Sequence, residues 1–464
     1  MPDLRNQTVL VAGLDPRGQA ACELLLRLAA RVVAVDGADT PALREVAAAL
    51  RRAGAQVELG VATVPEVAFE LAVVSSEVPR TSPLLAGLTA REVPVIGELE
   101  LGFQHARCLT LAIAGTNGKS TTADLLQRLL AHEHRQSVIC GPEAQPACAA
   151  VNQGRELDFL ILQATAQQLA ATHSFRPSVA VLLNLWPNAQ AGSASHEDYV
   201  RAQARLFANQ QSSDWAIVQC EALAQLTALG LTPRGKVVTF SAHDSAADLY
   251  VERGLLISRI DGWSGPLLDM DHGQLRGPHN AENLMAALAA GRALRLPLEG
   301  MVSVLRTVAP LPHRCEIIAE PGGVRFISDA AGTNLHALTS ALRSVAPAAG
   351  GLPNVWLIAG GPDHGLDFHS VGPLISQRVK GAFLLGEARE QLRAAWGLFT
   401  PCMLVASLAE AAAEAAKRAL PGDVVLFSPA SAGVAPSGGA EPHGEVFRQA
   451  VYAICSGDNW RHPN

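Results

Sequence analysis

The sequence predicts an α/β protein built from three domains, and two observations carry that prediction. The chain has 464 residues, which is too long for a single hydrophobic core. Apolar runs of strand length alternate along it with helical patterns, and these runs are continuous rather than alternating. Continuous apolar strands are typical of parallel sheets that are covered by helices on both faces.

The first domain is predicted over residues 1–106 and is Rossmann-like. It contains the apolar runs "TVLVAGLD" and "RVVAVDG", with the helical pattern "QAACELLLRLAA" between them, and "LAVVSS" near residue 75. It closes near "PVIGELELGFQ".

The central domain is predicted over residues 107–309 and the C-terminal domain over 310–464. The central strands are "LTLAIAG", "LDFLILQAT", "PSVAVLLNL", "DWAIVQC" and "KVVTFS", followed by the helix "HNAENLMAALAAGRALRLP". After "VAPLPHRCE" a further doubly wound block carries "VWLIAGG", "GAFLLG", "CMLVAS" and "DVVLFSPA". The segment "SPASAGVAPSGGAEPHG" lacks periodicity and is predicted to be a loop.

Composition narrows the class of partner. Hydrophobic residues make up 49% of the chain, and the net charge of -7 comes without a long basic run. These features argue against nucleic acid as the main partner and favour a small molecule. The N-terminus lacks a basic segment followed by a long apolar one, and no apolar run approaches the roughly 18 residues of a membrane span. We therefore expect a cytoplasmic protein without a membrane span. The eight cysteines show no C-x-x-C pair, which predicts free thiols.

The stretch "LTLAIAGTNGKSTTADLLQRLL", residues 109–130, reads as a buried strand, a glycine turn and a helix. Backbone amides at such a turn and the positive end of the helix form an anion site. Lys119 would reach the outer phosphates of a nucleotide, and Ser120 or Thr121 would face a magnesium ion. The strict pattern G-x-x-x-x-G-K-[ST] is not met, because Ile113 stands where its first glycine should be.

The spelling "AGTNGKSTT" resembles the phosphate loop of the Mur ligases, the ATP-dependent amide ligases of peptidoglycan precursor synthesis. Four further segments resemble the family in the same order: "GPHNAENLMAALAAGRALRLP", "LPHRCE", "FISDAAGTN" and "LIAGGPDHGLDF", with "GDVVLFSPASA" after them. The segment "VPVIGELELGF" is most similar to the D-glutamate-adding branch. The resemblance implies a UDP-sugar-binding-type N-terminal domain, a central ATP-binding domain of the P-loop ATPase type and a C-terminal amino-acid-binding-type domain.

The resemblance also implies the ligands. ATP and Mg²⁺ would be the cofactors, and a UDP-muramoyl precursor and D-glutamate would be the substrates. The implied reaction phosphorylates a carboxylate, and an amine then attacks the acyl phosphate. The implied ATP-binding residues are Gly115, Thr116, Asn117, Gly118, Lys119, Ser120, Thr121, Asn280, Asn283, Arg314 and Asp329, with Ser120 also the candidate metal ligand.

Several residues that the family's chemistry requires are replaced. Gln163 stands where the resemblance implies a magnesium-binding glutamate, Ala189 where it implies a metal-site histidine, and Gln203 where it implies a carbamylated lysine. His196 lies seven residues from the lost histidine and is a candidate to replace it. The resemblance also implies lysines where Ala331 and His364 stand. It implies an amino-acid-binding serine and aromatic residue where Gly433 and Ala440 stand.

The UDP-sugar side departs from the family as well. Gly13, Asp36 and Ser75 keep family-like positions, but Asp15 places a carboxylate in the turn "GLDPRG", where it would repel a pyrophosphate. Asp36 could accept a hydrogen bond from uracil or ribose, or it could be a strand-end carboxylate in water. "GPEAQP" replaces a glycine-asparagine segment of the family.

Three readings stay open from the sequence. The first is a divergent active ligase that adds D-glutamate to UDP-N-acetylmuramoyl-L-alanine through a rebuilt metal site. The second, which we favour, is a nucleotide-binding relative with impaired or altered catalysis, which could act on another cell-wall protein. The third is an unrelated P-loop ATPase, which the C-terminal segments disfavour. No residue is a confident catalytic acid or base.

Overall fold

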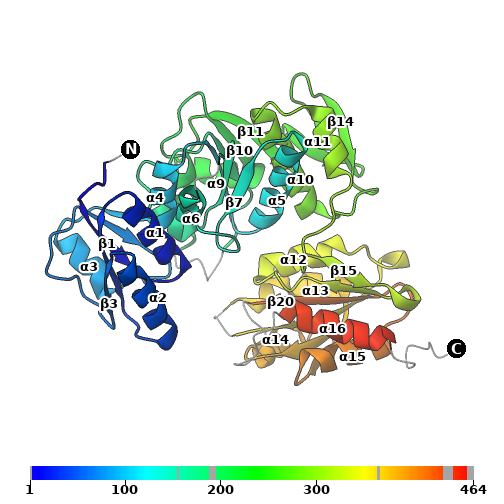
Figure 1. The fold of residues 1–464 in the computed structure, drawn as a ribbon. Coiled ribbons are helices and arrows are strands. Elements are labelled where there is room, and N and C mark those ends of the chain that lie inside the picture. Colours follow the sequence, from blue (N-terminus) through cyan, green and yellow to red (C-terminus); the bar gives the residue numbers. More distant parts are fainter. Residues whose placement is uncertain (1–2, 154–155, 188–194, 363–365, 432–442, 457–464) are drawn as a thin grey trace. The chain divides into compact units, whose positions relative to one another are not determined.

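The computed structural model describes residues 3–153, 156–187, 195–362, 366–431 and 443–456. Its strands form three sheets (Figure 1) of five, nine and six strands. The chain forms two compact units: Met1–Leu268 with Glu282–Leu305, and Asp269–Ala281 with Arg306–Asn464. The predicted α/β class with three strand-and-helix blocks is confirmed. The predicted domain boundaries at 106 and 309 stay predictions.

The first sheet has the order β3-β2-β1-β4-β5, and all its strands are parallel. Its strands are β1 (Thr8–Ala12), β2 (Arg31–Asp36), β3 (Gln56–Leu59), β4 (Leu71–Val74) and β5 (Val95–Gly97). Its helices are α1 (Pro16–Arg27), α2 (Pro41–Arg52), α3 (Pro83–Ala90) and α4 (Glu98–His105). Alternate residues of β1 enter different cores, with Val9 and Val11 on the side of α1 and Leu10 and Ala12 on the side of α3. Both faces are buried, which is why the run is apolar throughout.

The second sheet has the order β14-β13-β12-β11-β10-β9-β6-β8-β7. Its strands are β6 (Leu109–Ala114), β7 (Ser137–Cys140), β8 (Phe159–Gln163), β9 (Val179–Leu182), β10 (Trp215–Gln219), β11 (Lys236–Ser241), β12 (Leu249–Glu252), β13 (Leu255–Ser258) and β14 (Gly265–Asp269). The helical elements associated with it are α5 (Lys119–His132), α6 (Ala147–Asn152), α7 (Ala166–Ala170), α8 (His196–Ala204), η2 (Arg205–Phe207), α9 (Cys220–Ala228), α10 (Pro278–Ala293) and α11 (Leu298–Leu305). Strands β6 to β11 run parallel, so the loops after β6, β7 and β8 leave the same edge.

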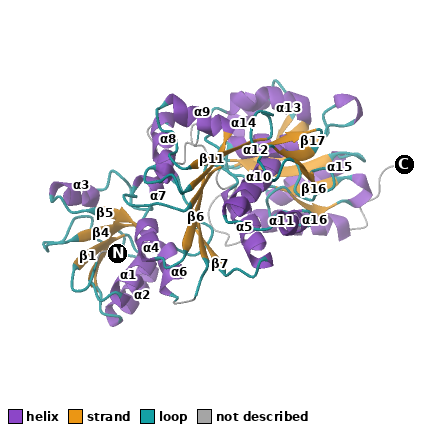
Figure 2. Ribbon diagram, turned by 90° about the horizontal axis from the view of Figure 1, so that it is seen from above, coloured by secondary structure: helices purple, strands orange, loops and turns teal. Residues whose placement is uncertain are grey.

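The third sheet, in the second unit, has the order β15-β16-β20-β17-β18-β19 and is parallel except for β15. Its strands are β15 (Glu316–Ala319), β16 (Arg325–Ser328), β17 (Val355–Gly360), β18 (Val379–Leu385), β19 (Cys402–Leu404) and β20 (Val424–Ala430). Its helices are η3 (Pro321–Gly323), α12 (Leu335–Ser344), η4 (Ala349–Gly351), η5 (Phe368–Val371), α13 (Gly372–Arg378), α14 (Arg389–Trp396), α15 (Leu408–Arg418) and α16 (His443–Ser456). Helices cover both faces of this sheet (Figure 2), so Leu357 and Ile358 enter opposite cores.

The sequence did not indicate the strands between residues 249 and 269. Strands β12 and β13 pair antiparallel through a two-residue turn at Arg253 and Gly254, both with positive φ. Such a turn matches the twist of a hairpin but usually carries Asn-Gly or Asp-Gly. Because Arg253 takes the first position of this turn, the sequence lacks the usual hairpin pattern.

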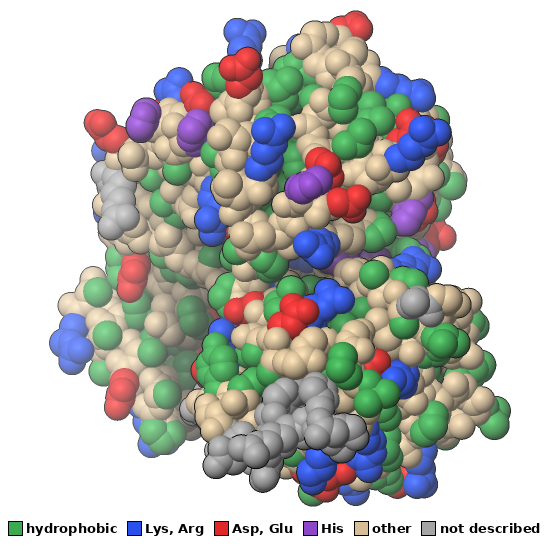
Figure 3. All heavy atoms as spheres, turned by 90° about the vertical axis from the view of Figure 1, so that its right-hand side faces the viewer, with side chains coloured by type: hydrophobic (Ala, Val, Ile, Leu, Met, Phe, Trp, Pro, Cys, Tyr) green, Lys and Arg blue, Asp and Glu red, His purple; other side chains and the backbone are tan. Residues whose placement is uncertain are grey.

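Two surface properties bear on partners. Among the described residues, no helix is both long and apolar enough to cross a membrane. On the face drawn in Figure 3, acidic and basic side chains are interspersed, and no broad basic patch is visible there.

Candidate functional site

The glycine turn after β6 has the backbone that the sequence predicts. Gly115 and Gly118 have φ of 129° and 90°, in the left-handed region that favours glycine. A Cβ at position 118 would also overlap Asn283 Oδ1. Helix α5 begins at Lys119 directly after Gly118, and its N-terminal amides and dipole have the arrangement that favours an anion.

The loop is tied to the end of the neighbouring strand β9 by Asn184, which sequence reasoning missed. The amide of Asn117 donates to Asn184 Oδ1 at 2.9 Å, and Asn184 Nδ2 donates back to the Asn117 carbonyl at 3.1 Å. The Thr116 amide donates to the Asn184 carbonyl at 3.1 Å. These bonds fix the loop backbone on a rigid strand end.

Lys119 folds back over the loop. Its Nζ donates to the carbonyl oxygens of Gly115 at 2.7 Å and Thr116 at 3.0 Å. These two carbonyls hold the ammonium group beside the helix N-terminus, where it can add positive charge to the anion site. The side chain of Thr121 is buried on the first turn of the same helix.

Ser120 brings together two side chains from neighbouring loops. Its Oγ lies 3.0 Å from Gln163 Oε1 at the end of β8 and 2.8 Å from Glu143 Oε2, in the loop after β7. Ser120, the candidate metal ligand, therefore contacts Gln163, which stands where the resemblance implies a magnesium-binding glutamate. Glu143 was not predicted, although its segment, "GPEAQP", departs from the family pattern.

Gln203 lies in a buried, neutral hydrogen-bonded chain that reaches the phosphate loop. Its Nε2 donates to Tyr199 Oη at 3.0 Å, and Tyr199 Oη lies 2.8 Å from Thr116 Oγ1. Gln203 is 1% exposed, and burial raises the pKa of Tyr199, so the phenol stays protonated at neutral pH. No member of this chain carries a charge.

His196 does not take part in that chain. It opens α8 after the N-cap Ser195, and its Nε2 lies 2.9 Å from Gln225 Oε1 of α9. Within the described ranges, no cluster of three or more His, Cys, Asp or Glu residues has metal-binding geometry. Ala189, where the resemblance implies a metal-site histidine, lies outside the described residues.

The two asparagines of α10 have different partners. Thr122 Oγ1 donates to Asn283 Oδ1 at 3.3 Å, which joins α10 to the helix of the phosphate loop. Asn280 Nδ2 donates to the carbonyl of Arg276 at 2.9 Å within the second unit. Both side chains are buried. Asn283 therefore lies at the phosphate loop. Asn280 instead bonds to the backbone just before the start of its own helix, α10.

In the second unit, Asp329 is the buried polar centre. Its carboxylate accepts from Ser428 Oγ at 2.9 Å and from the Cys315 amide at 3.3 Å. Burial raises the pKa of Asp329 to about 7, while the Ser428 and Cys315 bonds and the charge of Arg314 lower it. Ala331 follows in the next turn and supplies no charge. His364 and Gly433 lie outside the described residues.

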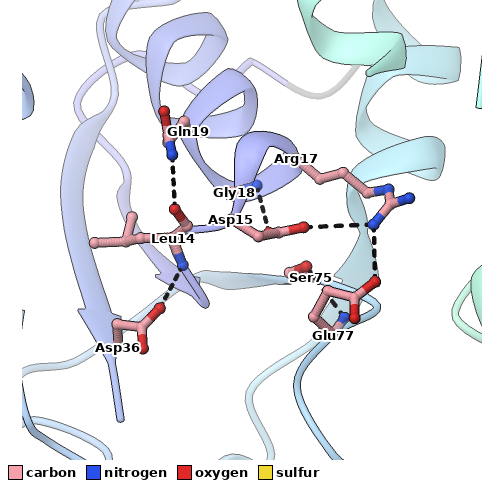
Figure 4. A network of polar contacts seen from close by, with 8 residues as sticks. All are labelled: Leu14, Asp15, Arg17, Gly18, Gln19, Asp36, Ser75 and Glu77. Atoms are coloured by element: carbon pink, nitrogen blue, oxygen red, sulfur yellow. Dashed lines mark hydrogen bonds and ion pairs between the residues drawn. The ribbon is translucent and has the colours of Figure 1, made fainter. Parts of the chain in front are cut away.

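In the turn between β1 and α1, the polar side chains bond to residues of the same domain (Figure 4). Asp15 caps α1 by accepting from the Gly18 amide at 3.2 Å, and Arg17 Nη1 lies 3.4 Å from Asp15 Oδ2 and 3.0 Å from Glu77 Oε1. A Cβ on Gly18 would collide with the carbonyl of Gly13. The turn has Rossmann geometry, but a carboxylate sits at the helix N-terminus.

Asp36 and Ser75 flank that turn. Asp36 Oδ2 accepts from the Leu14 amide at 2.8 Å and Oδ1 from the Ala38 amide at 2.9 Å, so its carboxylate holds the turn to the end of β2. Ser75 Oγ accepts from the Glu77 amide at 3.2 Å. Ser75 also lines a cavity of about 400 Å³, together with Arg17, Gln168 and His173. Gly13, at φ 85°, packs closely against Ser75 and Val78.

These features agree with the comparisons to known proteins. The model described as Mur ligase middle domain matches residues 113–291, and the one described as Mur ligase, glutamate ligase domain matches 313–431. The chain belongs to the Mur ligase family. Within that family it is of the MurD type, because the similar curated relatives are named UDP-N-acetylmuramoylalanine–D-glutamate ligases.

The relatives are similar over their whole length. The UDP-N-acetylmuramoylalanine–D-glutamate ligase of Acidobacterium capsulatum is 32% identical, with 99% of each chain covered. That of Pelotomaculum thermopropionicum is 31% identical over 98% of this chain and 100% of the relative. The solved MurF ligase of Thermotoga maritima, in complex with ADP, has a TM-score of 0.60 at 15% identity, covering 97% of this chain and 96% of that one. MurC of the same organism has a TM-score of 0.57 at 15% identity, covering 97% and 100%. The solved structures support the fold, and the family resemblance of the sequence is confirmed.

Proposed function

We propose that this chain is a MurD-type protein of peptidoglycan precursor synthesis that binds ATP at residues 115–121 and whose amide-forming reaction is impaired or altered. The observation that carries this proposal is the neutral chain of Gln203, Tyr199 and Thr116. Gln203 is locked by Tyr199 at the position where the family resemblance implies a carbamylated lysine. An amide cannot supply that anionic metal ligand.

The reaction class explains why this loss matters. Phosphorylating a carboxylate and then attacking the acyl phosphate concentrates negative charge, which metal ions and lysines normally neutralise. Here Lys119 keeps its place over the phosphate loop, whereas Ala331 supplies no ammonium group. Nucleotide binding is thus better supported than transfer.

The precursor side of the proposal rests on the relatives' names and on one cavity. The relatives' names give UDP-N-acetylmuramoylalanine and D-glutamate as their substrates. The cavity at Ser75 and Arg17 could receive a precursor, but Asp15 places negative charge beside the turn. A cell-wall protein partner and a cytoplasmic location remain predictions.

One observation favours the alternative, an active ligase that adds D-glutamate to UDP-N-acetylmuramoylalanine. Glu143 brings a carboxylate to Ser120, beside the neutral Gln163. A rebuilt cation site of this kind would remove part of the objection to catalysis.

The deciding experiment measures phosphate release from ATP and Mg²⁺ with UDP-N-acetylmuramoylalanine and D-glutamate, and with each of these omitted. We expect ATP binding by calorimetry but no release that depends on both substrates. Release that requires both, together with an amide product in the mass spectrum, would establish the active ligase instead. Absence of ATP binding would overturn the nucleotide-binding proposal itself.

A further inference from the structure

Glu143 occupies a position that its sequence segment did not reveal. The loops after β6, β7 and β8 leave one edge of the sheet, where the strand order is β6-β8-β7. They bring the Ser120 hydroxyl, the Glu143 carboxylate and the Gln163 amide together. Ser120 Oγ lies 2.8 Å from Glu143 Oε2 and 3.0 Å from Gln163 Oε1. One hydroxyl thus joins two side chains that are 20 residues apart.

The donor set suits magnesium. All three atoms are hard oxygen donors, and Mg²⁺ is usually held by one or two carboxylates plus substrate phosphates and water. Gln163 contributes a neutral oxygen, so Glu143 is the negatively charged member of the three. The hydroxyl of the residue after the phosphate-loop lysine is the magnesium ligand of phosphate loops in general.

Charge gives Glu143 two opposite effects. A carboxylate close to a bound triphosphate repels it when no cation lies between them, since like charges disfavour each other at short range. With a divalent cation between them, the same carboxylate attracts the complex. A purely structural Glu143 would instead act on nucleotide binding equally with and without the cation.

We propose that Glu143 is the carboxylate ligand of the magnesium ion in Mg·ATP at the phosphate loop, with Ser120, in place of the carboxylate missing at Gln163. The inference rests on the proposed binding of ATP. On this inference the magnesium ion bound with ATP has a carboxylate ligand from the protein. The neutral hydrogen-bonded chain at Gln203 is then a separate reason why catalysis is impaired.

The test is calorimetric titration with ATP in excess Mg²⁺ and in EDTA, for wild type and Glu143→Gln. We expect Glu143→Gln to weaken binding about tenfold or more in Mg²⁺ and to leave it equal or tighter in EDTA. Adding Gln163→Glu to that variant should restore the Mg²⁺ dependence. Glu252→Gln, an exposed position on β12 in the same unit, is the matched control and should change neither titration.

Equal weakening of ATP binding in Mg²⁺ and in EDTA would overturn the assignment, as would equal tightening in both. A second measurement follows Mn²⁺ binding to the protein alone by the loss of the free-ion EPR signal. We expect Glu143→Gln to lose that binding. If wild type bound no ATP, the proposed function would fail, and unchanged Mn²⁺ binding by the variant would then refute the role of Glu143 separately.

Discussion

At the scale of single residues, Lys119 is the group whose removal should matter most for nucleotide binding. The loop carbonyls of Gly115 and Thr116 hold its ammonium group at the start of α5. Charged hydrogen bonds contribute about 1.5–3 kcal/mol each, so Lys119→Ala should weaken ATP binding by about tenfold to a hundredfold. Calorimetry would measure this. Lys236→Ala, which removes a lysine stacked on Trp215, is the control and should leave the affinity unchanged. Unaltered binding in Lys119→Ala would remove the phosphate-loop assignment.

At the scale of elements, the turn between β6 and α5 depends on Gly118. An alanine there would face a positive φ, which costs about 1–2 kcal/mol, and would also displace Asn283 on α10. We expect Gly118→Ala to lower the urea midpoint and to abolish ATP binding. Gly230→Ala meets a similar φ of 70° with no atom within 4 Å, so it should cost stability but preserve binding. Equal behaviour of the two variants would show that backbone strain alone, and not the contact with Asn283, accounts for the effect.

The first turn of α1 gives a second test at this scale. Asp15→Asn keeps an N-cap side chain while it removes the negative charge from the turn where the family resemblance implies a diphosphate. We expect the affinity for UDP-N-acetylmuramoylalanine to rise about fivefold, since a half-buried like charge that Arg17 partly offsets is worth about 1 kcal/mol. Titration calorimetry at low and high salt would measure it, and the gain should shrink as salt rises. Asp15→Ala should lose about 1 kcal/mol of stability with the cap. A gain in affinity that does not change with salt concentration would argue against a charge effect.

Most strands that the sequence predicts correctly are buried on both faces, although β11 and β19 are partly exposed. Runs such as those around Val9 or Leu357 are apolar because helices cover each side, and the pattern records this directly. Strands β12 and β13 are short, partly exposed and joined by an unusual turn, so no periodic signal marks them. Element boundaries and edge strands depend on tertiary contacts that a local pattern does not contain.

The candidate site follows the same division. The phosphate loop and the substituted positions are predictions that the sequence alone allows, because a motif fixes its own spacing. Asn184, Tyr199 and Glu143 cannot be predicted in this way, because their partners are 67, 83 and 23 residues away. Parallel strands predict that their loops meet at one edge, but loop conformation decides which side chain reaches Ser120.

At the scale of the whole molecule, the two compact units each contain a carboxyl group with a raised pKa. Burial raises the pKa of Glu282 to about 7 in the first unit and that of Asp329 to about 7 in the second. Both pKa values exceed those of the unfolded chain, so the folded state binds the proton more tightly. Each group therefore makes its unit less stable as pH rises from about 4 to 7.

This pair of carboxyl groups can show whether the two units unfold independently. Between pH 6 and pH 8 each group should cost its unit about 1.4 kcal/mol, one pKa unit's worth. Asp329→Asn should reduce the pH dependence of the second unit alone. Glu282→Gln should reduce that of the first alone, where the buried Glu98, whose pKa burial also raises, keeps a part of it. Hydrogen-exchange mass spectrometry along the urea titration would report the units separately, through peptides from β6 and β9 in the first and from β17 and β20 in the second. If either variant changed both units equally, the two would unfold as one cooperative body, and nucleotide binding at the phosphate loop would then stabilise the third sheet as much as the second.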